Sequence, residues 1–119
     1  MLEIQNPKQY NLEERTFEFA KKARDYVKKL SRTLSNIEYG KQLIRSSGSQ
    51  AANYIEANES LGKKDFVMRI RICRKESKES RLWLKLTEPD SFYVQEQQSL
   101  INEAVELMKI FGSILEKSK

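Results

Sequence analysis

Histidine is absent from this chain of 119 residues, and cysteine occurs once, at Cys73. A lone cysteine cannot form an internal disulfide, so the chain fits the reducing cytoplasm. Without imidazoles or a second thiolate the chain has no donor set for zinc, and we expect neither a metal nor a cofactor. Apolar runs of membrane-spanning length are missing, as are the segments of a signal peptide. The sequence therefore predicts a soluble cytoplasmic protein with no membrane role.

Proline and glycine are also scarce. Two prolines and four glycines leave few turns and favour long helices. Apolar residues make up 39% of the chain and charged residues 33%, so the apolar side chains must be concentrated on stripes. A chain of this length forms one domain with a real core. We therefore expect a single all-α domain over residues 1–119.

Apolar residues recur at helical spacing in four segments, over residues 11–34, 35–61, 63–86 and 90–115. Asn11 and Glu14 resemble a capping box at the start of the first segment, and Ser35 or Asn36 can cap the second. Because the connections after the second and third segments are short, consecutive helices should be antiparallel neighbours. The pattern predicts an up-down-up-down four-helix bundle, with residues 1–10 as a loose arm.

The second predicted helix contains small residues where a core helix usually has large apolar ones. On a helical wheel one narrow stripe combines Ile37, Gly40, Ile44, Ser47, Gly48, Ala51 and Ile55. A glycine inside a helix costs about 1 kcal/mol relative to alanine, so the small residues favour the close approach of another helix. That helix can belong to the same chain, in a tight internal packing, or to a second subunit.

The opposite side of the same helix is polar, and most of its side chains are short and uncharged. Such residues suit a half-buried contact in which each donor finds an acceptor. We therefore expect an oligomer interface formed by Gln42, Arg45, Ser46, Ser49, Asn53 and Glu56.

The third predicted helix is strongly basic. Six basic residues cluster on one side of its wheel with no acid among them: Arg71, Arg74, Lys75, Lys78, Arg81 and Lys85. Residues 1–86 carry 19 Lys and Arg against 11 Asp and Glu, whereas residues 87–119 carry 3 against 6. Phosphate backbones favour such stripes through counterion release, which predicts contact with RNA or DNA independent of sequence. No aromatic residues are interleaved with the stripe, so base-specific reading is not predicted.

The same basic side chains also fit two roles that involve no nucleic acid. They can form a solvated face, or they can meet an acidic protein partner, including the acidic fourth helix of a neighbouring subunit. Glu76 and Glu79 lie one turn apart, but no histidine, phosphate loop or nucleophile motif accompanies them, so we expect no enzyme and no catalytic residue. We expect these carboxylates to pair with Arg45 or with a neighbouring chain. Cys73 should be a buried, inert thiol.

Two motifs resemble the bacterial four helix bundle protein family, which includes proteins encoded in intervening sequences of 23S ribosomal RNA genes. The first is Gln42-Leu43-x-Arg45-Ser46-Ser47-x-Ser49-x-x-x-Asn53-x-x-Glu56-Ala57, and the second is Lys75-Glu76-Ser77-Lys78-Glu79-Ser80-Arg81-Leu82-Trp83-Leu84. The chain departs from the family pattern at Gly48, Gln50-Ala51 and Tyr54. The resemblance implies an antiparallel bundle that assembles into a ring, typically a homopentamer, without catalytic residues. A similar accessory protein of diversity-generating retroelements binds a reverse transcriptase and nucleic acid.

Overall fold

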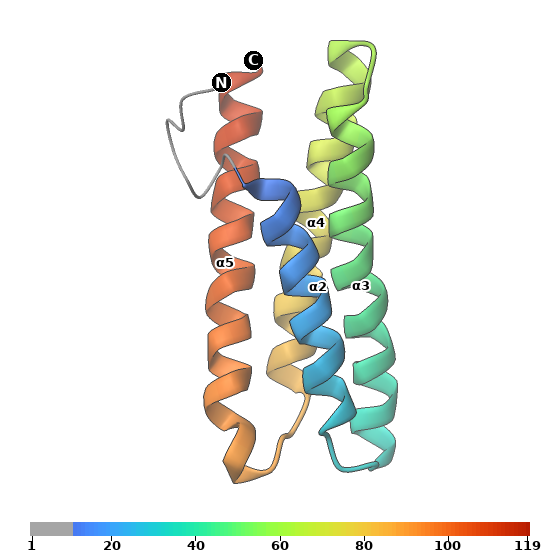
Figure 1. The fold of residues 1–119 in the computed structure, drawn as a ribbon, viewed down its shortest axis with the longest axis vertical. Coiled ribbons are helices and arrows are strands. Elements are labelled where there is room, and N and C mark those ends of the chain that lie inside the picture. The colour runs from blue at the N-terminus through green and yellow to red at the C-terminus, as the bar shows by residue number, and fades with distance from the viewer. Residues whose placement is uncertain (1–10) are drawn as a thin grey trace.

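The computed structural model describes residues 11–119, and these form four long α-helices (Figure 1). The helices are α2 (Leu12–Lys28), α3 (Leu34–Asn58), α4 (Lys63–Leu86) and α5 (Val94–Lys117), with the short 3-10 helix η1 (Ser91–Tyr93) before α5. The described part of the chain contains no strand. Successive helices alternate in direction in Figure 1, so the predicted all-α four-helix bundle is confirmed.

The helices follow one another around the bundle. α3 packs against α2 and α4, and α5 packs closely against α4 but only lightly against α2. α2 therefore lies across the bundle from α4, and Figure 1 shows it in front of α4. α2 is also the shortest of the four, so at one end α3, α4 and α5 continue beyond it.

In α2, α4 and α5 the core is built from the apolar stripes that the periodicity predicts. In α3 the prediction was wrong in part, because Ile44 and Ile55 of the predicted stripe are 45% and 44% exposed, whereas Leu43, outside the stripe, is buried. The fully buried side chains of the core include Phe19, Ala23 and Tyr26 of α2, Leu43 of α3, Ile70, Cys73 and Leu84 of α4, and Ala104, Leu107 and Phe111 of α5. Within each helix these residues recur every three or four positions, or at multiples of that spacing, so they share one face. Burial raises the pKa of the Tyr26 hydroxyl, although a hydrogen bond with Thr87 opposes the shift.

The first predicted helix is too long at its C-terminal end. α2 ends at Lys28, whereas Leu34, expected as its last core residue, is the first residue of α3 and 78% exposed. The cause is Thr33, whose hydroxyl accepts a hydrogen bond from the backbone N–H of Asn36 at 3.2 Å. A threonine side chain competes with the helix for backbone donors and favours the N-cap position.

Asn36 is therefore not the helix cap that the sequence suggested. Asn36 is 3% exposed. Its side-chain amide joins the connection between α2 and α3 to the connection that follows α4. Nδ2 donates to the carbonyl oxygens of Ser31 and Glu88 at 3.0 and 3.1 Å, and Oδ1 accepts from the backbone N–H of Glu88 at 2.8 Å. At the start of α2, the side chain of Asn11 makes no capping hydrogen bond. The expected loose arm, residues 1–10, lies outside the described residues.

None of the described helices has the length and apolar character needed to cross a membrane.

Candidate nucleic-acid interface

The six predicted phosphate-binding residues, here called the basic stripe, all lie on α4. Five of them are exposed and Arg81 is half-buried: Arg71, Arg74, Lys75, Lys78, Arg81 and Lys85. None of the six forms a hydrogen bond or an ion pair with another described residue. The positive charges of the stripe are therefore not neutralised within the described part of the protomer.

The stripe is wider than a single row. Arg71, Lys75 and Lys78 lie on the outer line of α4, away from the core. Arg74 instead leans toward α5, because a Cβ added to Gly112 would lie 3.9 Å from its Nε and Cζ atoms. Arg81 follows Arg74 by seven residues and thus shares this side of the helix. The stripe therefore presents cations both outward and along the seam between α4 and α5.

An open depression lies within the C-terminal part of the stripe. It is lined by Lys75, Lys78, Glu79, Arg81, Leu82 and Lys85. Leu82 is 46% exposed, so the surface mixes four basic groups with one aliphatic side chain and the carboxylate of Glu79.

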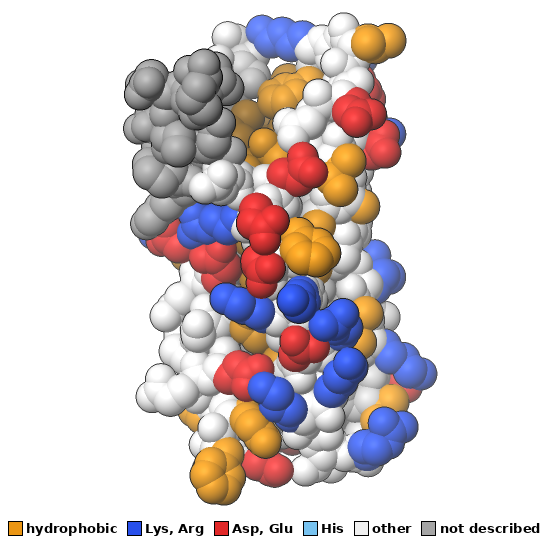
Figure 2. All heavy atoms as spheres, viewed as in Figure 1, with side chains coloured by type: hydrophobic (Ala, Val, Ile, Leu, Met, Phe, Trp, Pro, Cys, Tyr) orange, Lys and Arg blue, Asp and Glu red, His pale blue; other side chains and the backbone are white. Residues whose placement is uncertain are grey.

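A second basic surface lies on the opposite side of the bundle. Figure 2 views the face formed by α2, where Lys and Arg side chains gather in the lower half. The exposed basic residues there include Lys21, Arg24, Lys28 and Arg32. Arg24 is paired with Asp25 at 3.0 Å. The positive charge of the chain is thus divided between two faces.

The paired carboxylates of α4 are occupied within the chain. Arg45 of α3 lies 3.8 Å from Glu76 Oε2 and 3.7 Å from Glu79 Oε1, so the predicted ion pair is confirmed. Glu76 is 5% exposed and also accepts a hydrogen bond from Ser49 Oγ at 3.2 Å. These ion pairs and this hydrogen bond connect α3 to α4.

The expected interface face of α3 is divided: Ser46, Ser49 and Asn53 turn toward α4, whereas Gln42, Arg45 and Glu56 stay exposed. Ser46 is fully buried and its hydroxyl lies 2.7 Å from that of Ser80 on α4. The side-chain oxygen of Asn53 accepts from Arg69 Nη1 at 3.0 Å. The prediction of a half-buried, hydrogen-bonded contact was right, but the contact is with α4 of the same chain. Ser46 is fully buried among the described residues, so it leaves no exposed surface for the predicted oligomer contact.

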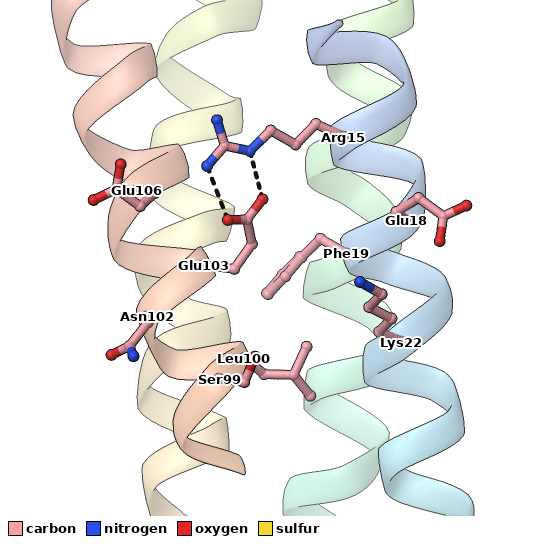
Figure 3. Close-up of a pocket in the computed structure, with 9 residues that line it drawn as sticks. All are labelled: Arg15, Glu18, Phe19, Lys22, Ser99, Leu100, Asn102, Glu103 and Glu106. Carbon is pink, nitrogen blue, oxygen red and sulfur yellow. Dashed lines mark hydrogen bonds and ion pairs between the residues drawn. The ribbon is translucent and has the colours of Figure 1, made fainter. Parts of the chain in front are cut away.

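A shallow groove separates α2 from α5 (Figure 3). Arg15 donates to both carboxylate oxygens of Glu103, at 2.6 and 2.9 Å, and this hydrogen bonding raises the pKa of the guanidinium. Figure 3 shows Phe19 and Leu100 between the two helices, while Asn102 and Glu106 lie on the α5 side. The guanidinium is paired, so the groove offers no free cation at Arg15. The described residues also contain no cluster of three or more potential metal ligands.

Comparison with known proteins agrees with the four-helix fold. The model of the 23S rRNA-intervening sequence protein family matches residues 8–113. The chain belongs to this family. A crystal structure from Bacteroides thetaiotaomicron VPI-5482, of a protein of unknown function from the S23 ribosomal protein family, has a similar fold. It superposes with a TM-score of 0.76 and 25% identity, over 92% of this chain and 98% of that one. No curated protein matches the chain.

Several contacts of the chain were not predicted from the sequence. Ser80 and Arg69 complete the seam between α3 and α4, and Arg15 pairs with a glutamate 88 positions away. A helical wheel places a residue on a face but does not say which helix meets that face. The exposed residue Phe92 was not singled out either. The sequence does show it, as an aromatic residue three positions after Pro89.

Proposed function

We propose that this family member is a non-enzymatic helical bundle that binds structured RNA, or another nucleic acid, through phosphate contacts. The observation that carries the proposal is the basic stripe, whose six cations have no acidic partner among the described residues. The nearest acids on α4 are occupied: Glu76 and Glu79 both face Arg45. The family name links relatives of the chain to a ribosomal RNA gene, which fits RNA as the ligand.

The length of the stripe suits a nucleic-acid backbone. From Arg71 to Lys85 a helix rises by about 21 Å at 1.5 Å per residue. Along the axis of a B-form duplex, one strand has a phosphate about every 3.4 Å, so roughly six phosphates of one strand fall within that axial length. Contacts of this kind release condensed counterions and give affinity that falls steeply with salt.

Charge reversal on α4 tests the proposal. We expect the protein to bind a labelled RNA hairpin at low salt in a fluorescence-anisotropy assay, and the triple variant Arg74→Glu, Lys78→Glu, Arg81→Glu to lose that binding. The matched control is Lys21→Glu, Lys28→Glu, Arg32→Glu, which makes the same change in net charge on the opposite face and should retain most of the affinity. Absence of binding by the wild type, or equal losses in the two triple variants, would contradict the assignment to α4.

We further propose that the protein is a homo-oligomer, with a pentameric ring as the expected form, and that the outer face of α3 carries the contact. Gln42, Arg45 and Glu56 remain exposed there, beside Ile44 and Ile55, which are 45% and 44% exposed. Beside Ile44 and Ile55, on the stripe of small residues, a Cβ added to Gly48 would meet nothing within 4 Å. A helical glycine that no neighbour requires within the protomer suits the close approach of another subunit.

Light scattering at high protein concentration tests the assembly. We expect the wild type to have the mass of an oligomer and the variant Gly48→Gln to be a folded monomer, because glutamine is a good helix former but places bulk on the contact. The control is Gln95→Ala on the exposed face of α5, which should leave the mass unchanged. A monomeric wild type would refute the ring.

The second candidate function is that of a protein–protein adaptor. Such an adaptor could be an accessory protein that binds a nucleic-acid enzyme such as a reverse transcriptase. Leu82, half-exposed in the depression among Lys75, Lys78 and Lys85, favours it because mixed apolar and basic surfaces suit acidic protein segments. If the wild type does not bind RNA but binds an acidic polypeptide, and the α4 triple variant does not bind that polypeptide, the adaptor role replaces the first proposal.

A further inference from the structure

Phe92 is the most exposed aromatic residue in the described part of the chain. It lies in η1 and exposes 90% of its surface, whereas Phe17, the next, exposes 54%. Its ring touches Tyr93, with centroids 6.4 Å apart and planes tilted by 50°. So large an apolar ring left in water contributes little to the core and is available to a ligand.

The backbone that carries Phe92 is anchored on both sides. The Thr87 hydroxyl lies 2.8 Å from the Tyr26 hydroxyl in the core. Gln97 of α5 donates to the carbonyl oxygens of Leu84 and Thr87 at 2.8 and 3.1 Å. These bonds fix the end of α4 against the start of α5, with η1 between them. A ligand that contacts Phe92 therefore meets a pre-organised aromatic group and does not have to order a free loop.

Phe92 lies at the end of the bundle where the basic stripe finishes. Lys85, the last residue of the stripe, is in the last turn of α4, and Phe92 follows six residues after α4 ends. Another cation is also close: the ammonium group of Lys29 lies 5.3 Å from the Tyr93 ring centroid and 2.8 Å from Glu96 Oε1. The basic stripe supplies cations that can contact phosphates, and η1 adds the aromatic ring of Phe92 beyond the last cation of the stripe, Lys85.

We infer that Phe92 stacks against an unpaired base of a nucleic acid whose backbone lies along the basic stripe. This inference rests on the proposed function and narrows its ligand. Bases inside a duplex are already stacked and paired, so the ligand class is RNA or DNA with unpaired nucleotides: a loop, a bulge or a single-stranded end. Every base has a π-face, so stacking on Phe92 requires no particular sequence.

Three ligands and four proteins test the inference. The ligands are a hairpin with an unpaired loop, a single strand and a blunt duplex, with equal numbers of phosphates. The proteins are the wild type, Phe92→Ala, Phe92→Trp and the control Phe17→Ala, which removes the other strongly exposed phenylalanine, on α2. Circular dichroism establishes that each variant is folded.

Phe92→Ala should weaken binding of the hairpin and the single strand by about fivefold or more, and leave duplex binding unchanged. Because no charge is removed, its salt dependence should equal that of the wild type. Phe92→Trp should retain the affinity, and Phe17→Ala should have no effect. Equal affinity of Phe92→Ala and wild type for unpaired ligands overturns the inference, as does an equal loss on all three ligands.

The inference and the proposed function can fail separately. If Phe92→Ala binds like the wild type while charge reversal on α4 abolishes binding, the stacking fails and the phosphate-binding proposal stands. If the wild type binds no nucleic acid, both fail. If Phe92→Ala instead changes the mass of the assembly without weakening nucleic-acid binding, Phe92 is a subunit contact and the inference is overturned.

Discussion

Two glycines of α3 should respond differently to the same substitution. At Gly48 an added Cβ meets nothing within 4 Å, whereas at Gly40 it would lie 3.0 Å from Val27 Cγ1 and 4.0 Å from Leu30 Cδ1 on the α2 side. Alanine in a helix interior is favoured over glycine by about 1 kcal/mol. Gly48→Ala should therefore stabilise the protomer by about 1 kcal/mol, which raises the midpoint of thermal unfolding by roughly 4 °C for a domain of this size.

Gly40→Ala should not show this gain. Val27 is β-branched and has one strongly preferred rotamer in a helix, so its methyl group cannot turn away without strain. The displacement offsets most or all of the improvement in helix propensity. Thermal unfolding followed by circular dichroism, at a concentration where light scattering shows monomers, measures both variants. Equal stabilisation by the two substitutions would refute the close packing of α2 on Gly40.

Three further predictions concern buried or partly buried groups. Ser46→Ala or Ser80→Ala leaves one buried hydroxyl without its partner and should lower the free energy of unfolding by about 1–2 kcal/mol; urea unfolding of the double variant should show less than the sum of the two losses. Burial raises the pKa of the Cys73 thiol to about 12 from 9.0, so the thiol ionises more readily in the unfolded chain than in the folded one. The stability that is present below pH 9 should therefore fall as the pH rises toward 12, and should fall less in Cys73→Ala. A urea midpoint that stays constant over this pH range would contradict the prediction. Glu103→Gln should weaken the two-bond pair with Arg15 and cost on the order of 1 kcal/mol, again measured by urea unfolding, and no loss would show that the pair contributes nothing.

Periodicity was enough to predict the number of helices, their order and most of the core. The Lys63–Leu86 helix has the limits that the sequence predicts, because Gly62 and Pro89 bound an uninterrupted apolar pattern. The end of α2 could not be predicted in the same way, since Leu34 fits the spacing of the first helix. The hydroxyl of Thr33 decides the boundary, and its advantage as an N-cap is too small to read from spacing alone.

The site was predicted less completely than the fold. The basic stripe follows from the wheel of one helix, because an outward face needs no knowledge of neighbouring helices. The face with Ser46, Ser49 and Asn53 was correctly predicted to form hydrogen bonds, but it packs against α4 of its own chain. A helical wheel cannot distinguish an internal seam from a subunit contact, since both bury small polar residues.

The most direct test of the central claim is the salt dependence of nucleic-acid affinity. The variant Lys75→Gln, Lys78→Gln, Lys85→Gln removes three exposed charges of the stripe without introducing acids. Each lost phosphate contact lowers the slope of log K against log salt concentration by about 0.7–0.9, so the slope should fall by roughly 2–3 relative to the wild type. An unchanged slope would contradict the claim that the α4 stripe binds the phosphate backbone.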